Sequence, residues 1–107
     1  MKIWLDDTRT PPDGSWKWLK TAEDVIDWFR LNHDVWDVEV LSLDNDLGEG
    51  LDEGYKVLDW LEEKKFYVPN FVVPKKIQVH SANPVARRRM EQSIERMVGS
   101  NQYRRKL

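Results

Sequence analysis

Two pairs of acidic residues stand out in this sequence because each pair follows directly where a hydrophobic run ends. The pairs are Asp6 with Asp7 and Asp44 with Asp46. Crowded carboxylates repel one another unless a cation or a proton lies among them. Such oxygen ligands suit Mg²⁺, which binds one or two carboxylates and keeps water molecules that a phosphate can replace. We therefore expect Asp6, Asp7 and Asp44 to hold Mg²⁺, and Asp44 and Asp46 to take part in catalysis. The alternative is that all four acids only form the turns after strands.

A third hydrophobic run ends in residues that can handle a phosphate group. His80 and Ser81 follow Val79, and Asn83 with Pro84 is typical of the cap and first residue of a helix. Histidine exchanges protons near neutral pH, and such acid–base help is worth about 10²–10⁴-fold in rate. Free N–H groups at a helix start bind phosphate. We expect His80 to be catalytic and Ser81 and Asn83 to bind phosphate. The alternative for His80 is a purely structural hydrogen bond to a neighbouring strand end.

Arg9 is a further candidate for phosphate binding because it lies two residues after Asp7. A guanidinium group can donate two parallel hydrogen bonds to a phosphate. The alternative for Arg9 is a surface ion pair with Asp6 or Asp46.

The order of hydrophobic and polar runs predicts the elements that position these residues. Strands are expected at residues 2–6, 16–20, 37–43 and 75–79, and helices from residue 21 to about 33, from 53 to 65 and from 84 to about 98. Helices between successive strands imply parallel pairing and right-handed crossovers, so we expect an α/β fold with the strand order 2-1-3-4. The carboxyl ends of parallel strands meet at one rim of a sheet, where ligands bind.

The composition restricts the class of protein. A chain of 107 residues forms one domain, which we expect at residues 1–99, followed by a basic tail at 100–107. The sequence holds no cysteine, which excludes disulfides and thiolate chemistry. No hydrophobic run approaches the roughly 20 residues that span a membrane, and the N-terminus turns acidic too early for a signal peptide. We expect a cytoplasmic protein with no membrane partner.

The chain holds six tryptophans, a high number for its length. Three of them are core candidates: Trp4, Trp28 and Trp60. The other three are Trp16, Trp18 and Trp36. For these three we favour burial against helices over an aromatic platform that stacks on a nucleic-acid base.

Positive charge gathers in the last part of the sequence. Residues 84–107 hold seven basic groups and two acids, and three of the basic groups are consecutive, Arg87-Arg88-Arg89. A solvated helix face explains most charge runs of this kind. The alternative is a surface that attracts an anionic ligand or a protein partner.

Several motifs together resemble those of cyclic-phosphate processing receiver-like domains, which are degenerate relatives of response-regulator receivers. These motifs are Leu5-Asp6-Asp7-Thr8-Arg9 with Pro11-Pro12, Ser42-Leu43-Asp44-Asn45-Asp46-Leu47-Gly48, Gly54-Tyr55, Val79-His80-Ser81-Ala82-Asn83-Pro84 and Met90. The resemblance spans nearly the whole chain. It implies a three-layer, flavodoxin-like fold and a role in handling the cyclic phosphate ends of RNA or of nucleotides.

The sequence also departs from that family. Asn45 stands where many relatives have histidine, and Arg87-Arg88-Arg89 replaces the usual small or acidic residues after Asn83-Pro84. The fifth strand of true receivers, with its lysine, has no counterpart here. The missing strand and lysine speak against a phosphorylation-driven switch. Asn45 bears on whether catalysis is retained, if the histidine of the relatives is catalytic.

Three hypotheses about function follow from these observations. The first is a hydrolase of the phosphodiesterase type that opens a cyclic phosphate, using the aspartates, Mg²⁺ and His80. The second is a module that binds a nucleotide or phosphate without chemistry, which Asn45 supports. The third is a protein-interaction domain that docks a partner through Arg87–Arg89.

Overall fold

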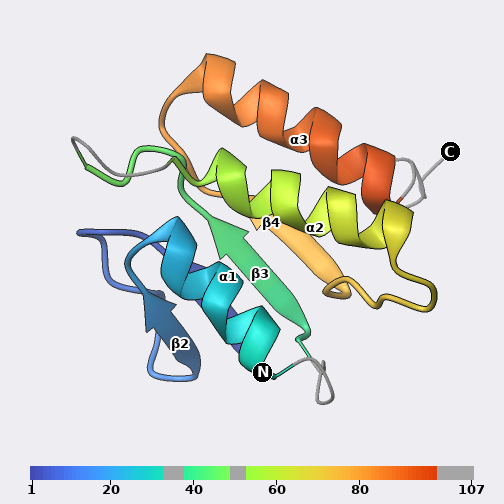
Figure 1. Ribbon diagram of the computed structural model, residues 1–107. Helices are drawn as coiled ribbons and strands as arrows, with labels where there is room; N and C mark the ends of the chain where they lie inside the picture. The colour runs from blue at the N-terminus through green and yellow to red at the C-terminus, as the bar shows by residue number, and fades with distance from the viewer. Residues whose placement is uncertain (33–37, 49–52, 99–107) are drawn as a thin grey trace, which may run out of the picture.

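Four short parallel strands form the sheet of this protein. The computed structural model describes residues 1–32, 38–48 and 53–98 (Figure 1). The strands are β1 (Lys2–Leu5), β2 (Trp16–Leu19), β3 (Val40–Leu43) and β4 (Lys76–Val79). They pair in the order β2-β1-β3-β4, and every pair is parallel. The receiver-like α/β class and the strand order expected from the sequence are therefore confirmed.

Three helices cover one face of this sheet (Figure 1). They are α1 (Ala22–Leu31), α2 (Tyr55–Tyr67) and α3 (Pro84–Val98). α2 packs against both α1 and α3, and α3 also packs against β4, so the three form a single layer. The start of α1 is fixed as the sequence predicts, because the Thr21 Oγ1 atom accepts a hydrogen bond from the Asp24 N–H at 3.0 Å.

The described elements make two layers where the family resemblance implies three, and the topology explains the difference. The crossovers from β2 to β3 and from β3 to β4 run in the same direction across the sheet, so right-handed connections place their helices on the same face. The β1–β2 connection runs in the opposite direction and contains no helix. The second face therefore receives no helix from the described residues.

Strand alternation divides the side chains between the two faces. The odd-numbered residues of β1, β3 and β4 point toward the helices and are buried, and they form the centre of the core: Ile3, Leu5, Leu41, Leu43, Ile77 and Val79. Burial of each such side chain contributes about 1.5–3 kcal/mol. The even-numbered residues point to the other side, which we call the open face: Lys2, Trp4, Trp16, Trp18, Val40, Ser42, Lys76 and Gln78. Within the described ranges, no helix is long and apolar enough to cross a membrane.

Element ends differ from the sequence predictions by a few residues. The strand predicted at 37–43 is present at Val40–Leu43, and α2 extends to Tyr67 rather than 65. The predicted basic tail, His33, Trp36 and Asp37 lie outside the described residues.

Candidate functional site

Asp6 is the centre of a polar cluster at the carboxyl ends of β1, β3 and β4. Its side chain is fully buried, and it continues the even-numbered alternation of β1 onto the open face. The Oδ1 atom accepts hydrogen bonds from the N–H groups of Thr8 at 3.0 Å and of Arg9 at 2.8 Å. The Oδ2 atom accepts from Arg9 Nε at 3.0 Å and contacts His80 Nε2 at 3.1 Å. A carboxylate offers about four acceptor positions, and all four of Asp6 are used.

His80 is held from three sides. Its Nε2 atom contacts Asp6, and its Nδ1 atom lies 2.8 Å from the Ser42 Oγ atom. Ser42 is fully buried and also accepts a hydrogen bond from Gln78 Nε2 at 3.1 Å. The imidazole ring stacks on Trp4 with the ring centroids 3.8 Å apart. Because an ionised Asp6 only accepts hydrogen bonds, the proton of a neutral His80 lies on Nε2, and Nδ1 accepts from the Ser42 hydroxyl.

Arg9 bridges two of the three strand ends. Its Nε atom pairs with Asp6, and its Nη2 atom lies 3.3 Å from Asp44 Oδ1. The carbonyl of Arg9 accepts a hydrogen bond from Trp4 Nε1 at 2.9 Å, which ties the loop after β1 to the open face. Of the two ion pairs considered for Arg9, the structure contains the one with Asp6. Its second partner is Asp44 rather than Asp46.

Burial and hydrogen bonding set the protonation states of this cluster. Burial alone would raise the pKa of Asp6, but the N–H groups of Arg9 and Thr8, His80 and the Arg9 charge outweigh it and lower that pKa. Burial lowers the pKa of His80 below its ordinary value, although Asp6 and Asp44 oppose the change. Near neutral pH the cluster therefore pairs an ionised Asp6 with a neutral His80.

The three aspartates expected to hold a metal lie together. One carboxylate oxygen from each of Asp6, Asp7 and Asp44 falls within 4.8 Å of the others. Asp6 and Asp44 are buried, and Asp7 is half-buried. All three ligand atoms are hard oxygens, which suits Mg²⁺. Arg9 forms ion pairs with two of these carboxylates, Asp6 and Asp44.

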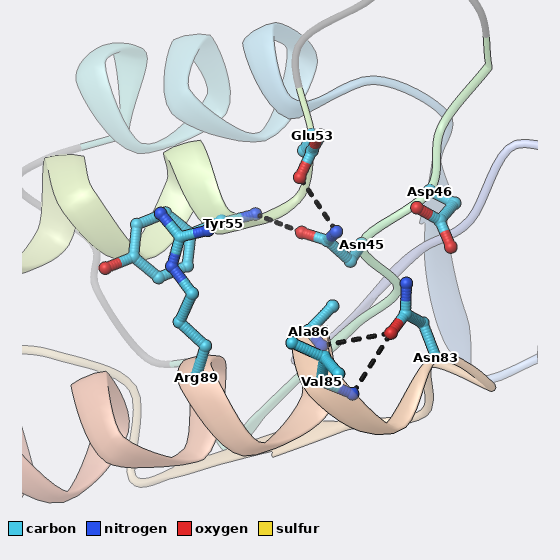
Figure 2. A pocket seen from close by; sticks show the side chains of 8 residues that line it. All are labelled: Asn45, Asp46, Glu53, Tyr55, Asn83, Val85, Ala86 and Arg89. Carbon is cyan, nitrogen blue, oxygen red and sulfur yellow. Dashed lines mark hydrogen bonds between the residues drawn. The ribbon is translucent and has the colours of Figure 1, made fainter.

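For the other predicted site residues, Asp46, Ser81 and Asn83, the structure gives contacts outside this cluster. Asp46 is exposed, and it lines a neighbouring pocket of about 180 Å³ together with Asn83. Figure 2 shows this pocket between the end of β3 and the starts of α2 and α3, with Asp46 and Asn83 on one side and Tyr55 and Arg89 on the other. Arg89 lies over the Tyr55 ring at 4.2 Å.

Asn83 and Ser81 build the start of α3. The Asn83 Oδ1 atom accepts hydrogen bonds from the N–H groups of Val85 and Ala86, each at 3.1 Å, as drawn in Figure 2. The buried Ser81 Oγ atom accepts from the Asn83 N–H at 3.2 Å. Two of the N–H groups expected to be free for phosphate are thus already bonded, because asparagine at this position is an efficient cap.

Asn45, which follows Asp44 at the end of β3, anchors the start of α2. Its Nδ2 atom donates to Glu53 Oε2 at 2.9 Å, and its Oδ1 atom accepts from the Tyr55 N–H at 3.1 Å. Its backbone carbonyl accepts from the Gly54 N–H at 2.9 Å. Both ends of the Asn45 amide are therefore engaged within the protein.

Sequence reasoning missed three members of the cluster: Trp4, Ser42 and Gln78. Trp4 was expected only in the core, whereas it supports the His80 ring. The available signal was strand alternation: Trp4 precedes Asp6 by two positions, and Gln78 precedes His80 by two. Residues two apart in a strand share a face.

A comparison with protein families agrees with this arrangement. The model of the cyclic-phosphate processing receiver domain matches residues 1–96. No curated protein and no solved structure matches the chain. The matched range contains all four strands, both acidic pairs and His80. The chain therefore belongs to the family of cyclic-phosphate processing receiver domains.

Proposed function

We propose that this domain binds a 2′,3′-cyclic phosphate at the rim formed by Asp6, Arg9, Asp44 and His80, and opens it by hydrolysis. The observation that carries the proposal is the meeting of two donors on one anionic oxygen. Arg9 Nε and His80 Nε2 lie 3.0 and 3.1 Å from the same Asp6 Oδ2 atom. A charged donor and a proton carrier that converge on one oxygen are the groups that a phosphate ligand requires.

The charge of the cluster supports a role for a divalent cation in this proposal. Asp6, Asp7 and Asp44 bring three carboxylates, Arg9 brings one positive charge, and His80 is neutral near pH 7. An anionic phosphate would be repelled by this excess of negative charge. Mg²⁺ held by the three aspartates would draw charge from the phosphate oxygens.

Arg9 would change partners when the site is filled. All four acceptor positions of Asp6 are occupied, and two of the bonds come from Arg9. For Asp6 to face a cation, the Arg9 side chain has to release Oδ2. Half of the Arg9 side chain is exposed, so it is free to turn toward a phosphate at the same rim. Arg9 then serves as a bidentate phosphate ligand.

The proposed reaction consumes one water molecule. The water oxygen bonds to phosphorus, the bond from phosphorus to one ribose oxygen breaks, and that ribose oxygen gains the proton that the water loses. For this step the proton of the neutral His80 ring would lie on Nδ1, where the buried Ser42 Oγ atom accepts its hydrogen bond, in place of the Nε2 tautomer that pairs with Asp6 in the structure. Nε2, the ring nitrogen that faces the aspartates, would then take the proton from water and pass it to the ribose oxygen. The Asp6 carboxylate would stabilise the imidazolium that forms.

Binding without chemistry is the second candidate function, and a specific observation favours it. Both nitrogens of His80 already have partners within the protein, and both ends of the Asn45 amide do as well. A module of this kind would hold a cyclic nucleotide through Arg9 and Mg²⁺ and leave it unchanged.

Phosphorus NMR on 2′,3′-cyclic AMP separates these two functions. Hydrolysis predicts conversion to a monophosphate that requires Mg²⁺ and that falls about 100-fold in His80→Ala. Asp44→Asn should also abolish the dependence on Mg²⁺. Asp59→Asn is the matched control, since Asp59 is an exposed acid of α2, and it should keep the full rate.

Two results would reject the hydrolase. One is the absence of product from the wild-type protein, and the other is a rate that His80→Ala leaves unchanged. A ligand-dependent rise in melting temperature without product would establish the binding module instead.

A further inference from the structure

We propose that the open face of the sheet binds single-stranded RNA and leads it to the rim where the cyclic phosphate is handled. This inference deepens the proposed function by naming its substrate, a cyclic-ended RNA strand rather than a free nucleotide. The observation behind it is a sheet face that no described helix covers and that presents paired tryptophans and lysines.

Two lysine–tryptophan pairs lie on this face. Lys2 is the cross-strand neighbour of Trp16, and its Nζ atom lies 5.0 Å from the centre of the indole ring. Lys20 Nζ lies 4.7 Å from the ring centre of Trp18. Both tryptophans are half-buried, so part of each ring is accessible. A lysine side chain that leaves its ring for a phosphate would free an aromatic surface for the adjoining base.

The charged side chains that the strands place on the open face are all basic. They are Lys2 and Lys76, and Lys20 continues the same alternation directly after β2; each is at least partly exposed. At the rim, Asp6 and Asp44 continue the same alternation. At the other end of the strands, the exposed Asp13 lies close enough to Lys2 for their charges to interact. In the helical layer, by contrast, α1 carries three acids and one arginine, whereas α3 carries the basic run Arg87–Arg89. An anionic strand would therefore be attracted to the open face in preference to α1, and α3 is the competing basic surface.

The chemistry of the face fits a single strand in particular. Unpaired bases stack on aromatic side chains while lysines contact the backbone, which is the general mode of sequence-tolerant single-strand binding. Trp4 connects the open face to the rim. Its ring centroid lies 5.5 Å from that of Trp16, in an edge-on contact, and 3.8 Å from that of His80, on which it stacks. A four-residue strand is about 13 Å long, so the face accommodates a short stretch next to the terminal phosphate.

Fluorescence anisotropy with a labelled six-nucleotide, unstructured RNA tests the proposal. The RNA carries an ordinary 3′-hydroxyl and the buffer contains EDTA, so the result does not depend on turnover. The triple variant Lys2→Glu, Lys20→Glu and Lys76→Glu should bind about tenfold or more weakly, with a salt dependence reduced by about two in logarithmic slope. The matched control reverses three exposed lysines elsewhere, Lys17→Glu, Lys56→Glu and Lys65→Glu, and should retain binding.

A tryptophan variant tests the stacking. Trp16→Leu should weaken RNA binding about tenfold, and Trp16→Phe should restore most of it. Urea denaturation identifies loss of folding, and the phenylalanine variant keeps the test decisive if the leucine variant does not fold. A duplex RNA of equal length should compete poorly, because its bases are not available for stacking.

Three results would overturn this inference. One is equal loss of binding in both triple variants, which would mean that net charge alone matters. Another is affinity for the six-nucleotide RNA no higher than for 2′,3′-cyclic AMP. The third is a dimer that the Lys2, Lys20 and Lys76 substitutions dissociate, because the face would then join two copies of the chain. If 2′,3′-cyclic AMP is hydrolysed alongside any of these results, the proposed function stands. If RNA binds but no cyclic phosphate is hydrolysed, only the catalytic step is rejected.

Discussion

The imidazole ring of His80 lies flat against the indole ring of Trp4, with the two planes 2° apart. This stack covers one side of the histidine, and burial is the largest cause of its lowered pKa. We therefore predict that Trp4→Leu raises the pKa of His80, whereas Trp4→Phe changes it less. NMR titration of the ring protons measures this, and His33→Gln identifies the resonances because the chain has two histidines. A lower pKa in Trp4→Leu would contradict the assignment of burial as the cause.

The stability of the fold should depend on pH through His80. Its pKa is lower in the folded protein than the ordinary value of about 6.5, so the unfolded chain binds more protons in the range between the two values. The contribution is thus complete above about pH 6.5 and is lost as the pH falls from there through the folded pKa. Urea unfolding between pH 7.5 and 5.5 should show a smaller decrease for His80→Gln than for the wild type. An unchanged decrease would mean that other groups cause it.

Gly54 is required for the close approach of α2 to the end of β3. A Cβ atom at this position would lie 1.8 Å from the Asp44 carbonyl oxygen, which belongs to the backbone and cannot turn away. Gly54→Ala should therefore lower the free energy of unfolding by about 3 kcal/mol or more, by overpacking and loss of the helix start. Gly14→Ala is the control, because a Cβ there meets nothing within 4 Å. Equal stability of the two variants in urea would disprove this contact.

Asn83 allows its capping role to be separated from phosphate binding. Asn83→Ala should cost about 1 kcal/mol, because the Val85 and Ala86 N–H groups lose their acceptor. Asn83→Asp keeps the cap, so its stability should match the wild type. If the start of α3 also contacts the ligand, Asn83→Asp should weaken the binding of 2′,3′-cyclic AMP, because the new carboxylate repels the phosphate. Unchanged affinity in calorimetry would assign Asn83 to capping alone.

Strand positions, strand order and the meeting of Asp6, Asp44 and His80 were predictable from the sequence. Each follows from a local rule: hydrophobic runs predict strands, linking helices predict parallel pairing, and the carboxyl ends of parallel strands share a rim. The capping role of Thr21 was likewise visible from residue type and spacing.

Other features depend on tertiary contacts that a single sequence does not display. The pairing of Arg9 with Asp44 and of His80 with Ser42 joins residues far apart in the chain. The sequence predicts that Asn83 caps α3, but it does not show which N–H groups the Asn83 Oδ1 atom accepts from. Those bonds decide which N–H groups at the start of α3 stay free for a phosphate. The single helical layer follows from the β1–β2 link, which contains no helix, so that no described helix covers the open face.

A crystal structure of the protein soaked with Mg²⁺ and a slowly hydrolysed analogue of 2′,3′-cyclic AMP would show whether the rim of the sheet binds the phosphate. We expect a cation between Asp6, Asp7 and Asp44, a phosphate within hydrogen-bonding distance of Arg9, and His80 Nε2 facing that phosphate. A ligand found only in the pocket lined by Asp46, Tyr55 and Arg89 would contradict this expectation, as would Arg9 still paired with both Asp6 and Asp44 while the phosphate is bound elsewhere.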